Sequence, residues 1–423
     1  MSFLEELQWR GLVHQTTHPE LAALFEQEKF VLYCGFDPTV DSLHIGSLIP
    51  ILGLARFQRA GHRPIALIGG GTGMIGDPSG KSQERQLLVS EEIDRNVVGI
   101  EMQLRRYLDF SGDNSAIIAN NMDWLGHVRL VTFLRDVGKH FSVNAMMAKD
   151  SVRARLEDRE HGISFTEFSY QLLQAYDFLQ LYDTHHCRLQ IGGSDQWGNI
   201  VSGMDLVRRM RPEAKTYGLT FPLVTKADGS KFGKTESGNV WLDPKRTSPY
   251  RFYQFWINSA DADVGRYLRG FTFLEREEIV ALERDAQAAP EKRAAQRRLA
   301  EEVTRFVHGD AELAKAQRAT EAMFGGDLAG LDDETLEDVF GEVPSSALPA
   351  SMLDEGRLLV DVLVECGVFP SKGEARRMIQ NGGLYLNNQR ADADAKLGPS
   401  SLCGRTMAVV RKGKKHYHLL RFG

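Results

Sequence analysis

The sequence predicts an α/β fold: a Rossmann-like, doubly wound parallel sheet with a helical insertion, followed by an all-helical domain and a small α+β module. Three observations support this prediction. Short apolar runs alternate with helical patterns in the first half of the chain, the composition beyond Pro249 is rich in Arg, Glu, Ala and Leu, and the last part reads as helix, basic helix and strand. The five strand-like runs are residues 30–34, 64–68, 116–119, 188–191 and 220–224.

Composition also suggests the domain boundaries. The sheet domain covers residues 1–225, with the helical insertion at about 91–183, and residues 226–248 form a loop and linker. The helical domain covers residues 249–335. A linker at residues 336–350 precedes the C-terminal module of residues 351–423.

The composition is that of an ordinary globular protein, since 42% of the residues are hydrophobic and 26% are charged. The four cysteines form no Cys-x-x-Cys pair, which favours reduced thiols and no structural zinc. No run approaches about 18 uninterrupted apolar residues, and the N-terminus lacks a basic-then-apolar leader. We therefore expect a cytoplasmic protein that does not enter a membrane.

The net charge of −6 conceals a basic C-terminus. Residues 371–423 contain eleven Lys or Arg and three Asp or Glu, a charge of +8, so residues 1–370 carry −14. A basic end on an acidic body favours a polyanion partner, with RNA or DNA first, although a solvated basic tail is the alternative. The candidate RNA-binding residues are Lys372, Arg376, Arg377, Lys412, Lys414 and Lys415.

Residues 33–47 lie between a strand-like run and a helical pattern that continues to Gly61. The start of that helix would aim unpaired N–H groups at the loop, and such groups attract phosphate. Thr39 and His44 would add side-chain donors to the charge on a transferring phosphoryl group. The alternative is an ordinary turn between a strand and a helix, with a histidine near the helix cap.

A glycine-rich loop at residues 69–81 follows the second strand-like run. It is not a Walker A loop, because Ile75 stands where that motif needs glycine. Residues 71–76 satisfy the dinucleotide fingerprint Gly-x-Gly-x-x-Gly, but an Asp-Pro-Ser-Gly turn follows where the helix should open, which disfavours a dehydrogenase. What remains is a thin loop that allows close backbone approach to a ligand. The charged residues in and just after this loop are Asp77, Lys81 and Arg85.

The helix expected at residues 168–179 has one polar face, formed by Tyr170, Gln174 and Asp177, in an otherwise apolar run. Solvent exposure would explain such a face. An uncharged tyrosine and glutamine beside a single carboxylate would also suit a small ligand that carries an ammonium group and a hydroxyl.

Two further loops carry candidate ligand residues. Residues 190–199 place a glycine pair and Asp195 at a strand end, where an aspartate commonly binds ribose hydroxyls, although helix capping is the alternative. Residues 231–235 place Lys231 and Lys234 around a glycine in a loop with little apolar anchoring. Such a loop can close over a polyphosphate as charge develops, but lysine-rich surface loops are also common.

Together these motifs resemble the class I aminoacyl-tRNA synthetases, and specifically the bacterial-type tyrosyl-tRNA synthetases, over essentially the whole chain. The resemblance implies a tyrosine–tRNA ligase that converts L-tyrosine and ATP, the latter with Mg²⁺, to tyrosyl-adenylate and then transfers the tyrosyl group to the 3′ end of tRNA(Tyr). It also implies a homodimer formed through residues 124–148. Residues 226–248 would be a mobile catalytic loop, residues 249–335 a tRNA-binding domain, and the C-terminal module a ribosomal-type RNA-binding fold.

The resemblance also implies a role for each motif residue. The phenol group of the substrate tyrosine would bind Tyr33 and Asp177. The carboxyl group of the substrate would bind Gln196, and its ammonium group would bind Asp77, Tyr170 and Gln174. The catalytic residues, which act on phosphate charge, would be Thr39, His44, Lys81, Arg85, Lys231, Lys234 and Thr235. The ATP-binding residues would be Cys34, Gly35, Asp37, His44, Ser47, Gly193, Asp195 and Lys234, with Cys34 and Asp195 on the ribose. No residue is expected to hold a protein-bound structural metal.

One residue departs from the family pattern. The family usually has His-x-Gly-His, and here Ser47 replaces the second histidine. Serine is shorter, so its contact with the nucleotide is in question, and it could instead cap the helix.

Two other functions remain open at this point. The tryptophanyl-tRNA synthetases are similar, but Tyr33, Asp177 and the basic module fit them poorly. A non-catalytic RNA-binding scaffold on a synthetase fold would need none of His44, Lys231 and Lys234.

Overall fold

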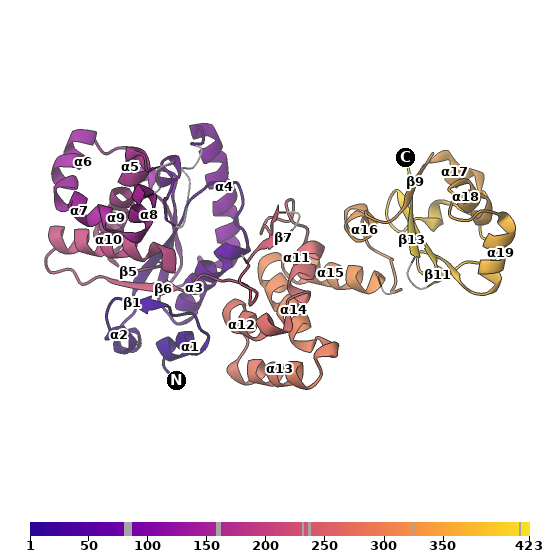
Figure 1. The fold of residues 1–423 in the computed structure, drawn as a ribbon, viewed down its shortest axis with the longest axis horizontal. Coiled ribbons are helices and arrows are strands. Elements are labelled where there is room, and N and C mark those ends of the chain that lie inside the picture. The colour runs from indigo at the N-terminus through magenta and orange to yellow at the C-terminus, as the bar shows by residue number, and fades with distance from the viewer. Residues whose placement is uncertain (80–86, 158–161, 231, 236–237, 324, 414–415) are drawn as a thin grey trace. The chain divides into compact units, whose positions relative to one another are not determined.

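The computed structural model describes residues 1–79, 87–157, 162–230, 232–235, 238–323, 325–413 and 416–423 (Figure 1). The chain forms two compact units. The first unit comprises residues 1–246 and 260–295, and the second comprises residues 247–259 and 296–423. Within the described residues, no helix is long and apolar enough to cross a membrane.

A six-stranded sheet forms the centre of the first unit, in the order β1-β6-β5-β2-β3-β4. Strands β2 to β6 are parallel, and β1 joins the edge of β6 in the antiparallel sense. The predicted parallel α/β sheet is confirmed. The strands are β1 (Gln15–Thr16), β2 (Val31–Phe36), β3 (Arg63–Ile68), β4 (Ile117–Asn120), β5 (Cys187–Gly193) and β6 (Tyr217–Phe221).

The last strand of the sheet differs from its prediction. The sequence predicts a strand at residues 220–224, whereas β6 ends at Phe221. Pro222 has no N–H to donate to a neighbouring strand, and Leu223 is exposed, so the apolar run continues past the sheet. The two-residue strand β1 is too short to leave a pattern in the sequence.

Helices cover both faces of this sheet. On one face α9 and α10 pack together, and Tyr33 and Phe178 belong to their shared core. On the other face α3 lies so close that a Cβ on Gly53 would be 2.5 Å from the ring of Phe221. Pro50 lies in the first turn of α3, where its missing N–H is harmless. Four long helices of this unit are α3 (Leu48–Arg59), α4 (Ser90–Tyr107), α9 (Phe165–His185) and α10 (Trp197–Met210).

The insertion expected at about residues 91–183 is mostly helical, but it contains β4, which pairs with β3. Short 3₁₀ turns at Ile45–Ser47, Thr72–Met74 and Ser194–Gln196 lie in the predicted ligand loops. The other elements of the first unit are α1 (Phe3–Trp9), α2 (Leu21–Gln27), α5 (Met122–Leu125), α6 (Leu130–Asp136), α7 (Val143–Met147), α8 (Asp150–Glu157), α12 (Asp261–Phe271), α13 (Arg276–Ala288), β7 (Lys234–Thr235) and β8 (Gly238–Asn239).

A buried ion pair joins α8 to the start of α9. The side chains of Arg155 and Glu167 are 2% and 1% exposed. Two guanidinium nitrogens of Arg155 donate to the two carboxylate oxygens at 3.1 and 2.8 Å, and its Nε donates to the carbonyl of Gly162 at 2.8 Å. Ser164 caps α9 by accepting a hydrogen bond from the Glu167 amide. These contacts fix the first turn of the helix that carries the predicted polar face.

The second unit combines helices with a five-stranded sheet in the order β11-β10-β12-β13-β9. Strand β9 pairs with β13 in the parallel sense, and the other pairs are antiparallel. The helical domain expected at residues 249–335 is divided, because α12 and α13 belong to the first unit. The elements are α11 (Pro249–Ile257), α14 (Ala294–His308), α15 (Asp310–Ala322), α16 (Asp333–Phe340), β9 (Ser345–Leu348), α17 (Ser351–Glu355), α18 (Leu359–Glu365), α19 (Lys372–Gln380), β10 (Leu384–Leu386), β11 (Gln389–Arg390), β12 (Met407–Lys412) and β13 (His416–Phe422).

The linker expected at residues 336–350 instead contains most of α16 and the whole of β9. Leu336 and Phe340 are buried in a cluster with Leu419 of the sheet and Ala322 of α15. The glycines and prolines around this segment therefore mark turns between packed elements, not a break between domains. Deletion after residue 350 would remove β13, the strand to which β9 is bonded.

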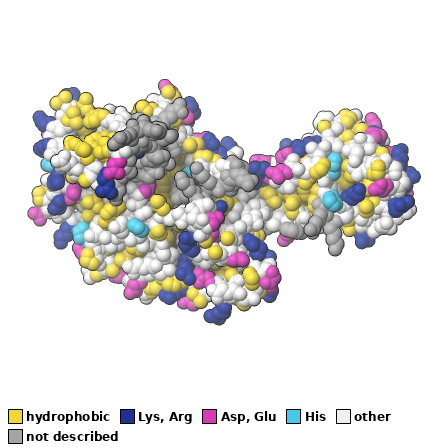
Figure 2. Space-filling view, in the orientation of Figure 1, with side chains coloured by type: hydrophobic (Ala, Val, Ile, Leu, Met, Phe, Trp, Pro, Cys, Tyr) yellow, Lys and Arg dark blue, Asp and Glu magenta, His cyan; other side chains and the backbone are white. Residues whose placement is uncertain are grey.

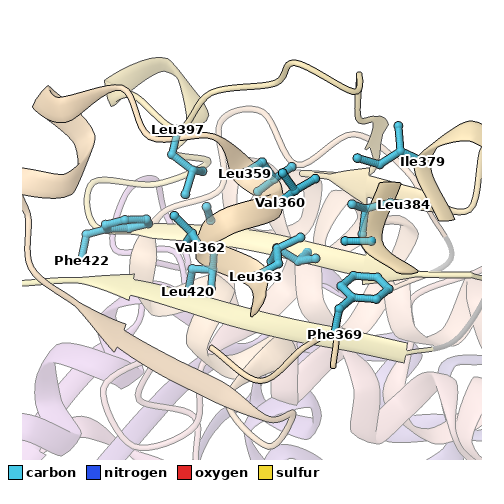
Figure 3. Close-up of a cluster of buried hydrophobic side chains, with 13 residues drawn as sticks. Leu359, Val360, Val362, Leu363, Phe369, Ile379, Leu384, Leu397, Leu420 and Phe422 are labelled. Carbon is cyan, nitrogen blue, oxygen red and sulfur yellow. The ribbon is translucent and has the colours of Figure 1, made fainter. Parts of the chain in front are cut away.

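The C-terminal sheet has a core on each face. Leu420 and Phe422 of β13 pack beneath α18 with Leu363 and Phe369 (Figure 3). The alternate residue Leu419 belongs to the cluster formed with α15 and α16. Because successive side chains of a strand point to opposite faces, β13 packs against α18 on one face and against α15 and α16 on the other.

His62 gives the first unit a measurable sensitivity to acid. It is fully buried beside Phe3, Phe25 and Phe57, and its Nδ1 accepts a hydrogen bond from the Phe30 amide at 3.0 Å. Burial lowers the pKa of His62 to about 4. Below a pH of about 6.5 the histidine is protonated in the unfolded chain, whereas His62 stays neutral in the folded protein until the pH approaches its lowered pKa. The free energy of unfolding therefore decreases as the pH falls through this interval.

We expect His62 to lower the free energy of unfolding by about 2 kcal/mol between pH 7.5 and pH 5. Urea denaturation at both pH values, for the unmodified chain and for His62→Gln, measures this as a difference in pH dependence. Equal pH dependence of the two proteins would contradict the prediction.

Candidate active site

The carboxyl ends of β2, β3 and β5 meet at one edge of the sheet, and three of the predicted loops begin there. Asp37 follows β2, the glycine-rich loop follows β3, and the turn Ser194–Gln196 follows β5. Helix α9 contributes Tyr170 and Asp177, which are both buried. The polar face predicted for this helix is therefore not a solvent-exposed surface.

Asp37 lies in a polar cluster with Tyr170 and Thr72. The Tyr170 hydroxyl donates to Oδ2 of Asp37 at 2.9 Å, and the Thr72 hydroxyl donates to Oδ1 at 2.8 Å. Burial, followed by the charges of Asp37 and Asp77, raises the pKa of Tyr170 well above its ordinary value. Asp37 is expected to bind ATP, and its carboxylate also contacts Tyr170, which is expected to bind the ammonium group.

Asp177 accepts hydrogen bonds from two side chains that follow β4. Asn121 Nδ2 donates to Oδ2 at 3.0 Å, and Trp124 Nε1 donates to Oδ1 at 2.7 Å. Burial raises the pKa of Asp177 to about 8 although both hydrogen bonds lower it. The carboxylate is thus poorly solvated, and a further hydrogen-bond donor would stabilise its charged form.

Tyr33 is 1% exposed, and its hydroxyl has no hydrogen-bond partner among the described residues. Its ring packs edge to face on Phe178 of α9. Burial, and then the charge of Asp177, raises the pKa of Tyr33 well above its ordinary value. A buried hydroxyl without a partner is costly unless a ligand completes its bonding.

Gln196 connects α9 to the glycine-rich loop. Its amide nitrogen donates to Oδ2 of Asp77 at 2.7 Å, and its amide oxygen accepts from Gln174 Nε2 at 3.3 Å. The other carboxylate oxygen of Asp77 accepts from the Ser79 amide at 2.9 Å. The structure therefore brings together all the residues predicted to bind the polar groups of an amino acid.

The predicted nucleotide side lies at the ends of β2 and β5. Burial, and then the charge of Asp195, raises the pKa of the Cys34 thiol to about 12. A Cβ on Gly35 would meet nothing within 4 Å, so the chain there is open to a ligand. On Gly193 a Cβ would lie 2.5 Å from Oδ1 of Asp195. Among the described residues, no group of three or more His, Cys, Asp or Glu side chains could hold a metal ion.

His44 is exposed and held in one orientation. Its Nδ1 accepts a hydrogen bond from the Gly46 amide at 3.0 Å, so the neutral ring carries its proton on Nε2. A Cβ on Gly46 would lie 2.6 Å from Cε1 of this ring. Thr39 is also exposed. Two of the predicted phosphate-contacting side chains are thus accessible to a ligand.

The loop of residues 226–248 is bonded to the His44 turn. The Ile45 amide donates to the carbonyl of Val240 at 3.0 Å, and the Leu242 amide donates to the carbonyl of Leu43 at 2.8 Å. The prediction of little apolar anchoring is wrong, because the ring of Phe232 packs on α12. Lys81, Arg85, Lys231, Lys414 and Lys415 lie outside the described residues. Lys234 and Thr235 form β7.

Ser47 is half-buried at the start of α3 and makes no capping hydrogen bond with its side chain. The capping role considered for it is therefore not present. Because a typical hydrogen bond between neutral groups contributes about 0.5–1.5 kcal/mol, we expect Ser47→His to alter the rate of amino-acid activation by less than about tenfold. ATP–pyrophosphate exchange measures this rate, and an increase of orders of magnitude would contradict the prediction.

Sequence reasoning missed Thr72, Asn121 and Trp124. Thr72 accepts from Asn121 Nδ2 at 2.9 Å while donating to Asp37, so it connects the two halves of the cluster. Asn121 directly follows a sheet strand, and this position could have identified it. No local pattern marks Trp124.

The described RNA-binding candidates lie on the C-terminal module. Lys372, Arg376 and Arg377 are exposed on α19. Lys372 pairs with Asp361 at 3.0 Å, and the Nζ of Lys412 lies 4.5 Å from the ring centre of Phe369. Arg376 and Arg377 are adjacent in sequence, so they point in different directions from the helix.

Two protein-family models match this chain. Residues 26–325 match the model described as tRNA synthetases class I (W and Y), and residues 335–420 match the tyrosine–tRNA ligase SYY-like C-terminal domain. The tyrosine–tRNA ligase of Roseiflexus castenholzii is 58% identical over 423 residues, which is 99% of each chain. This chain belongs to the tyrosine–tRNA ligase family.

Other members support the same assignment. The tyrosine–tRNA ligase of Geobacillus stearothermophilus is 57% identical over 425 residues, which is 100% of each chain. A solved structure, the C-terminally truncated mitochondrial tyrosyl-tRNA synthetase of Aspergillus nidulans, has a TM-score of 0.69 and 31% identity, covering 76% of this chain and 94% of that one. The tryptophanyl-tRNA synthetase of Plasmodium falciparum has a TM-score of 0.51 and 15% identity, which shows a shared fold alone. The predicted synthetase fold and family are confirmed.

Proposed function

We propose that this synthetase activates L-tyrosine with ATP and transfers the tyrosyl group to the 3′ end of tRNA(Tyr) in the cytoplasm. The observation that carries the proposal is the buried, unpartnered Tyr33 hydroxyl, whose ring packs on Phe178, the neighbour of the poorly solvated Asp177 on α9. A phenol can accept from Tyr33 and donate to Asp177 through a single oxygen. An indole N–H only donates, and a benzyl group does neither, so tryptophan and phenylalanine would leave buried groups unpaired.

The ammonium group of the substrate would bind where carboxylates gather. Asp37 and Asp77 both contribute charge at Tyr170, and Gln174 reaches the same region through Gln196. The amide oxygen of Gln174 is buried and has no partner among the described residues, which leaves it able to accept from an ammonium group. Gln196 would orient the substrate carboxyl group.

The first step needs no general base, because the tyrosine carboxylate is already ionised at neutral pH. One carboxylate oxygen forms a bond to the α-phosphorus of ATP, the bond to the β-phosphate breaks, and pyrophosphate leaves. Asp195 and Cys34 would hold the ribose, while Thr39 and His44, with Lys81, Arg85, Lys231, Lys234 and Thr235, would stabilise charge on the phosphates. Mg²⁺ would enter with ATP.

ATP–pyrophosphate exchange, measured with each amino acid in turn, tests the activity. We expect exchange that depends on tyrosine. Exchange with tryptophan instead would favour a tryptophan enzyme, and no exchange with any amino acid would favour a non-catalytic scaffold; either result would overturn the proposal.

We also propose that the chain forms a homodimer through the region of α6 and α7. Leu130 and Val131 of α6 are 70% and 77% exposed, and Phe165 at the start of α9 is 78% exposed. Figure 2 shows hydrophobic side chains gathered over the end of the molecule that carries α6. Analytical ultracentrifugation should give a dimer for the unmodified chain and a monomer for Val131→Asp. Val98→Asp, at an exposed apolar position of α4, is the control and should remain a dimer.

The basic C-terminal module would bind tRNA. The double variant Arg376→Glu/Arg377→Glu should leave tyrosine-dependent exchange unchanged and weaken tRNA charging, because phosphate contacts are lost. The negative slope of log affinity against log salt concentration should become less steep by about 2, since each lost phosphate contact removes about one unit of slope. Arg95→Glu, an exposed position on α4, is the control. Unchanged charging and salt dependence would overturn the assignment of Arg376 and Arg377.

A further inference from the structure

Helix α12 holds the beginning of the loop that contains Lys234. Asp263, in the first turn of α12, is 3% exposed. Its Oδ1 accepts from the Ala227 amide at 2.9 Å and from Arg266 Nη2 at 2.6 Å. Arg266 also donates to the carbonyl of Thr225. The Asp263–Arg266 pair therefore holds the backbone at Thr225 and Ala227, between the end of β6 and Lys234.

The same helix also holds the loop directly before Lys234. The ring of Phe232 stacks on Phe271, with centres 5.2 Å apart and planes 23° apart, and lies 5.2 Å from Tyr267. Gly233 then has a φ of +84°, which favours glycine, and a Cβ there would approach Ile45 to 3.0 Å. We call these two sets of contacts, from Thr225 to Phe232, the loop anchor.

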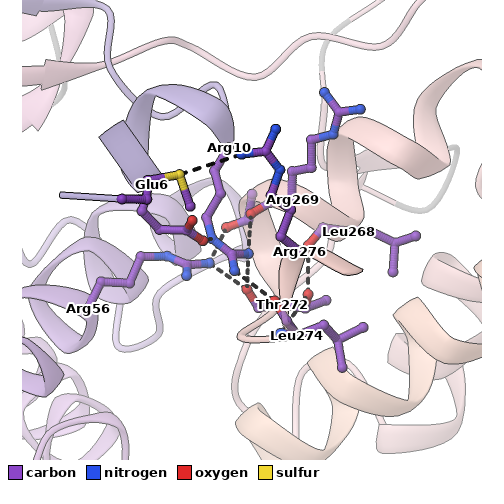
Figure 4. A network of polar contacts seen from close by, with 10 residues as sticks. Glu6, Arg10, Arg56, Leu268, Arg269, Thr272, Leu274 and Arg276 are labelled. Carbon is purple, nitrogen blue, oxygen red and sulfur yellow. Dashed lines mark hydrogen bonds and ion pairs between the residues drawn. The ribbon is translucent and has the colours of Figure 1, made fainter. Parts of the chain in front are cut away.

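The far end of α12 is fastened to the helix that follows His44. Arg56 of α3 donates to the carbonyls of Gly270 and Thr272 at 3.3 and 2.5 Å (Figure 4). Arg10, the residue after α1, donates to the carbonyls of residues 269, 272 and 274. These guanidinium groups satisfy the carbonyls that a helix leaves unpaired at its C-terminus. Helix α12 is thus bonded both to the Lys234 loop and to α3.

We infer that α12 positions the Lys234 loop against the His44 turn, and that Asp263 is a positioning residue for the activation step. This inference rests on the proposed function. Asp263 acts through the backbone at Thr225 and Ala227 and touches no substrate. A carboxylate that only favoured the positive N-terminal end of α12 would have no need of the Ala227 amide, which belongs to the loop.

Two substitutions separate positioning from a general effect on folding. Asp263→Ala removes both contacts. Asp263→Asn keeps an oxygen that can accept from Ala227. Asp261→Asn, at an exposed position two residues earlier on the same helix, is the matched control. Each protein is measured by ATP–pyrophosphate exchange with ATP and tyrosine varied separately, by adenylate burst to count active sites, and by urea denaturation.

We expect Asp263→Ala to lower kcat per active site by ~10-fold or more and to raise KM for ATP, because small displacements of catalytic groups have effects of this size. KM for tyrosine should not change, since the residues proposed to bind the substrate tyrosine lie on other elements. Asp263→Asn should recover most of the rate, and Asp261→Asn should behave as the unmodified chain. Phe232→Ala should reproduce the ATP-specific loss.

Several outcomes would overturn the inference. These are an unchanged kcat per active site in Asp263→Ala, equal losses in the ATP and tyrosine parameters, or unmodified kinetics in Phe232→Ala. Failure of the proposed function is distinguishable, because the unmodified chain itself would then show no tyrosine-dependent exchange.

Discussion

Asp177→Ala is expected to lower kcat/KM for tyrosine in ATP–pyrophosphate exchange by ~10²–10³-fold, because it removes a charged acceptor and leaves buried donors unpaired. Those donors are Asn121, Trp124 and the substrate phenol. Phenylalanine brings no hydroxyl to this end of the site, so its kcat/KM should change much less. The variant should therefore lose most of its preference for tyrosine over phenylalanine.

A matched control for this prediction lies on the same helix. Asp183 of α9 pairs with Arg211 at 2.7 Å on a partly exposed surface. Asp183→Ala should keep the exchange kinetics of the unmodified chain, since exposed ion pairs contribute about 1 kcal/mol or less and this one is remote from the predicted ligand residues. A folded Asp177→Ala protein with unmodified tyrosine kinetics would contradict the assignment of the phenol to Asp177.

Glu167→Ala is expected to lower the free energy of unfolding of the first unit by about 3–5 kcal/mol, because it leaves the Arg155 guanidinium buried without its partner. Both side chains are at most 2% exposed, so water cannot replace the lost bonds. Urea denaturation followed by circular dichroism measures the change. Replacing both partners, as Arg155→Met/Glu167→Leu, should recover most of the loss, because apolar side chains need no bonding partner.

Asp183→Ala serves again as the control, with an expected loss of less than about 1 kcal/mol. If Glu167→Ala were no more destabilising than Asp183→Ala, the buried pair would not hold α8 to α9. If the double replacement were as unstable as the single one, shape and not charge would dominate at this position.

Much of the first unit could be predicted because its signals are local. A buried parallel strand is a short apolar run, so β2, β3, β4 and β5 were recognisable in the sequence. Helical spacing alone placed Tyr170, Gln174 and Asp177 on one face of α9. Ligand residues could be predicted in the loops after strands, because ligands of parallel α/β sheets bind at the carboxyl ends of the strands.

The errors have a common physical origin. The partners of Asp37 could not be inferred either, because Thr72 and Tyr170 lie 35 and 133 residues away in the sequence. The linker expected at residues 336–350 was inferred from nearby glycines and prolines, whereas β9 is held by β13 at the other end of the module. Phe232 was not recognised as an anchor because its partners lie on α12.

The sequence by itself determined the alternation of strands and helices, the ligand loops, the polar face of α9 and the basic C-terminal module. These depend on residue type and spacing within a few turns of chain. The tertiary structure alone decided that the polar face is buried, that the Tyr33 hydroxyl has no partner among the described residues, and that α12 connects the Lys234 loop to α3. Burial and hydrogen-bond pairing depend on which distant segments meet, and no local pattern records that.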